Sequence, residues 1–310
     1  MTTVIHTRGL TKLYGRTHAL DGLDLSVAAG EVHGFLGPNG AGKSTAIRIL
    51  LGLARATGGA AEVFGADPWR NAVALHRRIA YVPGDVSLWP NISGGETIDL
   101  LSRMRGAVTR AAAYRAEKDR LLGSFQLDPR KKGRAYSKGN RQKVSLIAAF
   151  VVPADLYILD EPTSGLDPLM EVLFQREMAR VRAAGATVLL SSHILSEVEQ
   201  LCDRVSIIRA GTVVEAGTLA EMRHLTRVAV SFAAEGQATA LLASIPAAHD
   251  LRIENGRAIF TVASAEMAAT LPELSRLRVE GLRVEPPSLE ELFLRHYGDD
   301  LNSPKGADAA

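Results

Sequence analysis

Nine consecutive residues, Gly37 to Thr45, fit the phosphate-binding pattern G-x-x-x-x-G-K-[ST]. The pattern is credible only between a strand and a helix, and here an apolar stretch ends at Leu36 and a helical-looking segment follows, Ala46 to Leu53. Glycines let the backbone turn so that N–H groups converge on phosphate oxygens at a helix start. We expect Lys43 to reach the β- and γ-phosphates and Ser44 to bind Mg²⁺. The residues expected around a nucleoside triphosphate are Gly37, Pro38, Asn39, Gly40, Ala41, Gly42, Lys43, Ser44 and Thr45.

A second apolar strand, Leu156 to Leu159, ends in two adjacent carboxylates, Asp160 and Glu161. On a strand beside the phosphate loop, Asp160 would lie near Mg²⁺, usually through water, because this ion keeps part of its hydration shell. Glu161 would point at the water that attacks the γ-phosphate and act as general base. Acidic residues at strand ends are common, but one metal and phosphate site accounts for both carboxylates and for the lysine and serine of the loop.

His193 follows the next apolar run, Thr187 to Leu190. A lone histidine is usually a surface or core residue, yet this one is predicted at the carboxyl end of a strand, where it would sense and stabilise the γ-phosphate. The helical segment Leu169 to Ala184 separates the two runs. The order strand, helix, strand is what a parallel α/β sheet requires, and ligands bind at the carboxyl ends of such strands.

The flanking segments add two further parts to this α/β core. Val4 to Val32 predicts short strands separated by glycines, with one apolar face, and therefore an antiparallel sheet beside the phosphate loop. Helical spacing from Ser93 to Phe125 and from Asn140 to Val152 predicts a helical insertion, and Ser137 is an N-terminal signal for its second part.

Beyond a weaker change near Glu221 to Arg227, the residue types of a phosphate or metal site are missing. We interpret this part as a small α+β accessory domain, ferredoxin-like in character, for contacts or regulation. The tail from Asp299 to Ala310 is polar and is expected to be disordered. The strands expected in the accessory domain are Val228 to Phe232, Arg257 to Val262 and Leu282 to Val284, and the helices are Glu266 to Leu277 and Leu289 to Tyr297.

Composition excludes several classes of protein. The 36 basic and 34 acidic residues nearly cancel, which gives no general attraction to nucleic acid or anionic lipid, and no nucleic-acid partner is expected. The most apolar stretch, Val144 to Leu159, is interrupted by Pro153 and Asp155 and is shorter than the roughly 20 residues of a membrane span. Cys202 is the only cysteine, so disulfides and cysteine-based metal sites are excluded. We expect a soluble, cytoplasmic chain.

Further motifs at ordered spacing carry a family resemblance. Tyr14 precedes Gly15, the segment from Tyr136 to Lys143 reads YSKGNRQK, and Ser164 to Asp167 reads SGLD. Together with the phosphate loop and the carboxylate pair, these motifs resemble the nucleotide-binding subunit of an ABC transporter, from roughly Val4 to Leu219. The resemblance implies a P-loop NTPase (RecA-like) core with an antiparallel β subdomain and a helical signature subdomain, followed by the small α+β C-terminal domain. The expected divisions are an ATPase domain at 1–222, with helices at about 84–152, an accessory domain at 223–298 and a tail at 299–310.

The resemblance also implies how the site is completed. In the family, ATP and Mg²⁺ lie in a head-to-tail dimer, between the phosphate loop of one subunit and the signature of the other. Tyr14 would stack on adenine, Ser137, Lys138 and Gly139 would face the other subunit's ATP, and Asp167 would lie in the loop that crosses the interface. The neighbourhood of the signature is strongly basic, which is either a solvated face or an electrostatic aid to dimer closure. A homodimer is expected.

Two departures from the family pattern bear on activity. The signature has Lys138 where the family has Gly and Asn140 where it has Gln, while Ser137 and Gly139 are retained. Gly84 stands where the family places a metal-contacting glutamine, and glycine offers no ligand. Asp85 would substitute through water, or solvent would fill the Mg²⁺ shell; the sequence leaves both open.

The expected function is ATP hydrolysis that drives an exporter. Because the chain shows no membrane span, it would need a separate membrane-spanning permease, at the cytoplasmic face of the cell membrane. The segment Pro286 to Phe293 resembles bacterial drug and antibiotic exporters such as those for daunorubicin or tetronasin. The alternatives are a non-transport ABC ATPase, whose members usually show tandem ATPase domains or zinc-binding cysteines, and an ATP-dependent regulatory switch, which Gly84 keeps open.

Overall fold

The computed structural model describes residues 2–224, 227–233, 247–263, 266–276 and 279–285. Contacts within the chain divide it into two units, Met1–Ala216 and Gly217–Ala310. The division falls slightly before residue 222, the boundary expected from the sequence. No helix in the described ranges combines the length and the apolar character that a membrane crossing requires.

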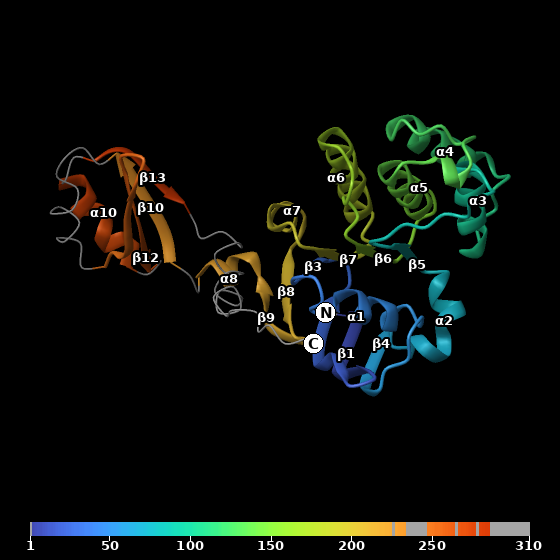
Figure 1. Cartoon of the computed structure of the whole chain (residues 1–310), viewed down its shortest axis with the longest axis horizontal. Helices are drawn as coiled ribbons and strands as arrows, with labels where there is room; N and C mark the ends of the chain where they lie inside the picture. The colour runs from blue at the N-terminus through green and yellow to red at the C-terminus, as the bar shows by residue number, and fades with distance from the viewer. Residues whose placement is uncertain (1, 225–226, 234–246, 264–265, 277–278, 286–310) are drawn as a thin grey trace, which may run out of the picture. The chain divides into compact units, whose positions relative to one another are not determined.

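Three strands of the first unit are buried along their whole length and lie side by side in a six-stranded sheet, ordered β5-β6-β7-β3-β8-β9 (Figure 1). The strands from β5 to β8 pair in parallel, as predicted. Burial on both faces is typical of parallel strands. The carboxyl ends of β3, β6 and β7 therefore meet at one edge of the sheet. The bounds are β3 Val32–Leu36, β5 Ile79–Val82, β6 Leu156–Asp160, β7 Thr187–Ser192, β8 Arg204–Arg209 and β9 Thr212–Thr218.

A second, antiparallel sheet in the order β2-β1-β4 lies beside this core, as predicted. Its strands are β1 Thr3–Tyr14, β2 Thr17–Ala28 and β4 Gly58–Val63. Of the glycines expected to separate the strands, Gly15 and Gly30 do so, but β2 runs through Gly22 without a break, and the pairing of β1 with β2 shifts register near Gly9 and Gly22. Both glycines have a positive φ, 54° and 80°, which accommodates the bulges without ending the strands.

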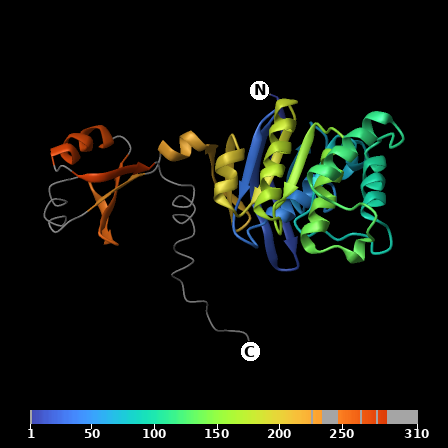
Figure 2. The ribbon, with the colours of Figure 1, turned by 90° about the horizontal axis from the view of Figure 1, so that it is seen from above.

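The helical insertion consists of three helices that group to one side of the sheets, shown in green in Figure 2. The predicted segment from Ser93 to Phe125 is divided, because the chain leaves the helical conformation after Arg105 and turns at Gly106, whose φ is 90°. Ser93 and Glu96 form a reciprocal capping box at the first helix. Ser137 caps the last helix, as predicted, by accepting a hydrogen bond from the Asn140 N–H. The helices are α3 Gly94–Met104, α4 Ala112–Ser124 and α5 Lys138–Phe150, and a short 3₁₀ turn, η1, covers Gly133–Ala135.

Of the remaining helices described in the first unit, α6 and α7 connect strands of the parallel sheet, and α1 and α2 connect it to β4 of the antiparallel sheet. Helix α1 directly follows the phosphate loop, and α6 joins β6 to β7. Asp167 begins α6 by accepting a hydrogen bond from the Met170 N–H at 3.1 Å. The bounds are α1 Lys43–Leu50, α2 Pro68–His76, α6 Pro168–Ala183 and α7 Leu195–Leu201.

The second unit is an α+β structure with an antiparallel sheet in the order β11-β12-β10-β13. Val230, Phe232, Phe260 and Leu274 form the centre of its core. Of the four strands in the described ranges of this unit, the sequence predicted three and missed β11. The predicted helix from Leu289 to Tyr297, the segment from Pro286 to Phe293 and the tail lie outside the described residues. The elements are α8 Leu219–His224, β10 Arg227–Ala233, β11 His249–Glu254, β12 Arg257–Ala263, α10 Met267–Arg276 and β13 Glu280–Glu285.

Candidate functional site

The phosphate loop joins β3 to α1 in a conformation that requires its glycines. Gly42 is the N-cap of α1 with φ 112°, and Gly40 has φ 85°. A Cβ atom at Gly37 would lie 2.6 Å from the carbonyl oxygen of Ile208, and one at Gly42 would lie 2.6 Å from that of Ala19. Only residues without a side chain fit at these two positions, so the loop brings its backbone against β2 and β8 and opens at the start of a helix.

Lys43 is buried inside this loop. Its Nζ donates hydrogen bonds to the carbonyl oxygen of Gly37 at 2.5 Å and to that of Pro38 at 3.2 Å. Burial lowers the pKa of Lys43, while the nearby carboxylates of Glu161 and Asp160 oppose the shift. A buried ammonium group within a glycine-rich turn at a helix start is an arrangement suited to a polyphosphate.

Asp160 and Ser44 are brought together across the edge of the sheet. The Ser44 hydroxyl donates to one carboxylate oxygen of Asp160 at 2.9 Å, and the Ser191 hydroxyl donates to the other at 2.5 Å. A serine hydroxyl and a carboxylate beside a phosphate loop match the oxygen ligands that Mg²⁺ takes along with water and phosphate. Sequence reasoning missed Ser191, whose only signal is its place at the end of β7, paired in register with Asp160.

Glu161 lies directly beyond β6 in a conformation that few residues other than glycine adopt. Its φ is 47°, and its backbone N–H donates to the carbonyl oxygen of Ser191 at 2.9 Å. Such a backbone costs on the order of 1–3 kcal/mol and is maintained only by its surroundings. One carboxylate oxygen of Glu161 lies 3.2 Å from Nδ1 of His193, which is half-exposed. The two residues that sequence reasoning placed at the γ-phosphate are therefore in direct contact.

Gly84 lies against Asp160 at the end of β5. A Cβ atom at Gly84 would lie 3.5 Å from the Asp160 carboxylate, an ordinary van der Waals distance. Asp85 has an exposed side chain that makes no hydrogen bond or ion pair within the described part of the chain. The backbone of this loop therefore approaches the carboxylate, and a side chain at 84 would point at it.

The signature residues contact the loop that follows Glu161 in the same chain. Lys138 Nζ donates to the Ser164 hydroxyl at 3.2 Å, and a Cβ atom at Gly139 would lie 2.6 Å from the Gly165 carbonyl oxygen. Gln142, one turn further along α5, donates from Nε2 to the Pro162 carbonyl oxygen at 2.8 Å. Sequence reasoning did not single out Gln142.

Tyr14 is the last residue of β1, away from these contacts in the sequence. Its ring is half-exposed, and the ammonium group of Lys12 lies 4.9 Å from the ring centroid. An exposed aromatic face that already lies beside a cation is available for stacking.

Comparison with known proteins agrees with this geometry. A family model described as ABC transporter matches residues 20–164. The daunorubicin resistance ATP-binding protein DrrA3 of Streptomyces coeruleorubidus is 36% identical, over 98% of this chain and 99% of that protein. The chain belongs to the ATP-binding subunits of ABC transporters. These ABC subunits are ATPases with the P-loop NTPase fold, as the resemblance predicted.

One further relative and two solved structures are also similar to this chain. The bacitracin transport ATP-binding protein BcrA of Bacillus licheniformis is 32% identical, over 96% of this chain and 98% of that protein. A solved ATP-binding subunit of an ABC transporter is 33% identical with a TM-score of 0.67, covering 72% of this chain and 93% of its own. A dimeric ATP-binding cassette described as a post-hydrolysis state with ADP and Pi is 23% identical, with a TM-score of 0.62 and coverage of 69% and 98%, and shares the fold.

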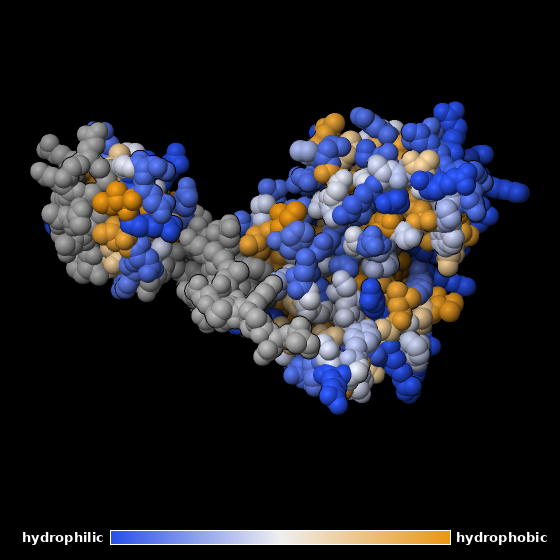
Figure 3. All heavy atoms as spheres, in the orientation of Figure 1, coloured by the Kyte–Doolittle hydropathy of each residue, from blue (hydrophilic) through white to orange (hydrophobic). Residues whose placement is uncertain are grey.

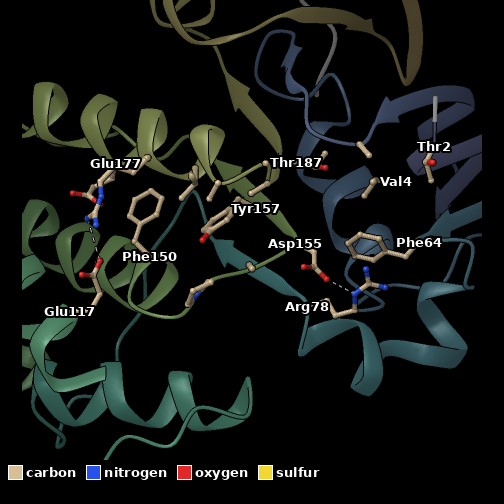
Figure 4. A pocket seen from close by; sticks show the side chains of 18 residues that line it. Thr2, Val4, Phe64, Arg78, Glu117, Phe150, Asp155, Tyr157, Glu177 and Thr187 are labelled. Atoms are coloured by element: carbon tan, nitrogen blue, oxygen red, sulfur yellow. Dashed lines mark hydrogen bonds and ion pairs between the residues drawn. The ribbon is translucent and has the colours of Figure 1, made fainter. Parts of the chain in front are cut away.

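Two of the cavities in the described part of the chain are candidates for further sites, and both lie away from the phosphate loop. One, of about 610 Å³, is found at the opposite ends of β6 and β7, near Asp155 and Thr187 (Figure 4). Its carboxylates all pair with arginines: Glu117 and Glu177 with Arg120 at 2.7 Å, and Asp155 with Arg78 at 2.6 Å. Because these acids are neutralised in place, we assign this cavity no part in the reaction.

The second cavity is an apolar groove of about 500 Å³, which we call the α2–α3 groove. Val73 and Met104 at its margin are 78% and 68% exposed, and hydrophobic side chains gather near these helices in Figure 3. Arg105 reaches from the groove to the end of α5, where it donates to the carbonyl oxygens of Ala149, Val152 and Pro153. The lining residues are Leu51, Leu53, Val73, His76, Ile79, Tyr81, Leu101, Met104, Arg105, Ala148 and Ala149.

Proposed function

We propose that the chain is the ATP-hydrolysing subunit of an exporter for a drug or antibiotic, acting with a separate membrane-spanning permease. The observation that carries the proposal is the contact between Glu161 and His193 at the sheet edge that also holds Lys43 and the Ser44–Asp160 pair. One edge thus collects a phosphate-binding cation, an oxygen pair suited to a metal and a candidate base. No other grouping within the described residues offers this set.

The proposed reaction assigns one task to each residue. Lys43 and the N–H groups of the phosphate loop would hold the phosphates, and Ser44 and Asp160 would hold Mg²⁺, while Ser191 orients the Asp160 carboxylate. Bound there, Mg²⁺ would neutralise charge on the phosphate oxygens. Glu161 accepts the proton of the water that attacks the γ-phosphorus, so that the bond to the β-phosphate oxygen breaks and ADP leaves. His193 orients Glu161 and donates an N–H toward the γ-phosphate.

The proposal completes each site with a second copy of the chain. Ser137, Lys138 and Gly139 at the start of α5 would meet the γ-phosphate of the other copy, where a helix N-terminus favours negative charge. Asp167, at the start of α6, would lie in the loop that crosses between copies, and Tyr14 would stack on adenine. Asp85 remains a proposed contact to Mg²⁺ through water.

The α2–α3 groove supports a permease partner. An apolar groove with the exposed side chains of Val73 and Met104 at its margin is suited to receive the apolar face of a partner helix. We assign it to a helix of the permease, which would place the subunit at the cytoplasmic face of the cell membrane. The cargo assignment rests on the relatives, whose names refer to daunorubicin and bacitracin.

Replacement of Glu161 tests the catalytic assignment. Glu161→Gln keeps the shape of the side chain and removes the base, so turnover of ATP should fall at least about 100-fold while ATP affinity stays within about threefold. Phosphate release and equilibrium nucleotide binding measure the two quantities. Equal turnover in Glu161→Gln and wild type would exclude Glu161 as the base.

Charge in the groove tests the permease assignment. Val73→Glu and Met104→Glu place a carboxylate on the apolar surface, so capture of a multi-span protein from membranes of the source organism should be lost while ATP turnover of the isolated subunit is kept. Val214→Glu, on an exposed part of β9, is the matched control. Capture that persists with both groove variants would show that the permease binds elsewhere.

A further inference from the structure

Gln142 connects helix α5 to the peptide that follows Glu161. Its side chain is 2% exposed, and its Nε2 atom donates to the Pro162 carbonyl oxygen at 2.8 Å. Pro162 has no N–H group, so this carbonyl is the only polar backbone group that it offers. A buried amide that satisfies a buried carbonyl is expensive to remove, because the partner loses its hydrogen bond without access to water.

The backbone around Glu161 is held from two sides. The Glu161 N–H donates to the Ser191 carbonyl on β7, and the Pro162 carbonyl accepts from Gln142 on α5. Within the loop, the Glu161 carbonyl accepts a hydrogen bond from the Ser164 N–H at 3.1 Å. Glu161 combines a positive φ of 47° with a proline as its next residue, and a residue before proline prefers an extended conformation. The conformation that turns the Glu161 carboxylate toward His193 is therefore held both by the loop itself and by restraints from β7 and α5.

The same helix holds the rest of this loop. Lys138 binds the Ser164 hydroxyl, and Gly139 approaches the Gly165 carbonyl so closely that no side chain fits between them. Together with the hydrogen bond from Gln142, these contacts lie within the first turns of α5, where the signature residues also lie. Helix and loop are thus packed as one piece.

We infer that Gln142 is a positioning residue for Glu161, and that it ties the catalytic base of a subunit to that subunit's own signature helix. The inference rests on the proposed function, in which Glu161 is the base and the signature meets ATP held by the second copy. ATP bound to one copy then contacts the start of α5 in the other copy. Through Gln142, this contact positions Glu161 of that other copy, which acts on the ATP bound to the same chain as Glu161. The amide acts through Glu161 and does not touch the reacting atoms.

Substitutions at Gln142 test this role with the full chain. Gln142→Met keeps the volume and removes the donor, and Gln142→Glu places an oxygen against the Pro162 carbonyl. Both should lower kcat by about 10- to 100-fold, because a small displacement of a catalytic group has effects of this size, with the KM for ATP changed less than about twofold. Ser145→Ala, one turn further along α5 and also buried, should keep the wild-type kcat.

A double-mutant cycle with Glu161→Gln separates positioning from a structural role. Once the base is absent, Gln142→Met should change the residual single-turnover rate by less than about twofold, since coupled residues are not additive. Additive losses, or a Gln142→Met variant with wild-type kcat, would overturn the assignment of Gln142 alone. If Glu161→Gln instead turned over ATP as fast as the wild-type chain, the proposed function on which the inference rests would be overturned.

Discussion

Gly84 leaves the Asp160 carboxylate facing backbone where the family has a glutamine side chain. The hydroxyls of Ser44 and Ser191 orient the carboxylate. A Cβ atom added at Gly84 would lie 3.5 Å from it. The φ of Gly84 does not lie in the left-handed region, so a side chain there would cause no backbone strain. Position 84 is therefore open to substitution in a way that Gly37 and Gly42 are not.

Gly84→Gln should restore an oxygen ligand near the proposed Mg²⁺ position. We expect the Mg²⁺ concentration that gives half-maximal ATP turnover to fall by about two- to tenfold, equivalent to roughly 0.4–1.4 kcal/mol of binding. A titration of turnover with Mg²⁺ at fixed ATP measures the change. Gly84→Ala supplies the Cβ atom without a ligand and should titrate like wild type. If the two variants behave alike, position 84 does not contribute to metal binding.

Residues with strict chemical requirements could be predicted from the sequence, and residues that act through packing could not. Lys43, Ser44 and the two carboxylates follow from a motif that only a few residue types satisfy. Ser191 and Gln142 stand in segments where serine and glutamine are ordinary. Their contacts depend on the register of β6 with β7 and on the path of α5 past the loop, which are properties of the assembled fold.

Strand β3 carries a buried polar chain at the end opposite the phosphate loop. His33 Nδ1 lies 2.9 Å from a carboxylate oxygen of Glu31, and Nε2 lies 2.8 Å from the Ser206 hydroxyl on β8. Burial opposes ionisation of Glu31, but hydrogen bonds from His33 and the Ala28 backbone outweigh it and lower the pKa of Glu31 below its ordinary value of 4.5. The ionised form is thus favoured by the fold.

The hydrogen-bonded series Glu31, His33 and Ser206 predicts that the stability of the fold depends on pH in the acid range. A lowered pKa in the folded state contributes stability that is present above the unfolded value of 4.5 and is lost as pH falls through the folded value. Glu31→Gln should therefore lower the free energy of unfolding at pH 7 by about 1–2 kcal/mol and flatten its decline below about pH 4.5. Urea denaturation at pH 7, 5 and 4 measures both effects, with Glu62→Gln for comparison, because the Glu62 side chain on the edge strand β4 is 42% exposed. A wild-type decline retained in Glu31→Gln would place the acid sensitivity elsewhere.

Periodicity alone located most elements but not their interruptions. The segment from Ser93 to Phe125 reads as one helix because the residues before and after Gly106 share helical spacing, but Gly106 takes φ 90° and ends α3 there. In β1 and β2, by contrast, glycines that usually interrupt a strand permit bulges within continuous pairing. The same residue type ends one element and bends another, depending on its neighbours.

At the scale of the whole molecule, each ATP site is expected to need two copies of the chain. Glu161→Gln retains the phosphate loop and the signature but does not consume ATP, so with ATP and Mg²⁺ it should form a particle of twice the mass of the 310-residue chain. Size-exclusion chromatography with light scattering measures this mass. Lys43→Ala, which lacks the buried ammonium group, should stay at the mass of one copy. A Glu161→Gln sample that stays at single mass in saturating ATP would contradict the dimer.

Helix α5 has a further mechanical consequence. Its 13 residues span about 20 Å, from the signature to the end that Arg105 closes from the α2–α3 groove. The helix is bound at its C-terminal end by the Arg105 guanidinium group and near its N-terminus by Gln142. A rigid helix held at both ends would move as a unit when one end is displaced. A permease helix that displaces Arg105 would therefore also displace the signature residues at the other end of α5, which are proposed to contact ATP. Movement of the permease and ATP hydrolysis would then be coupled through helix α5.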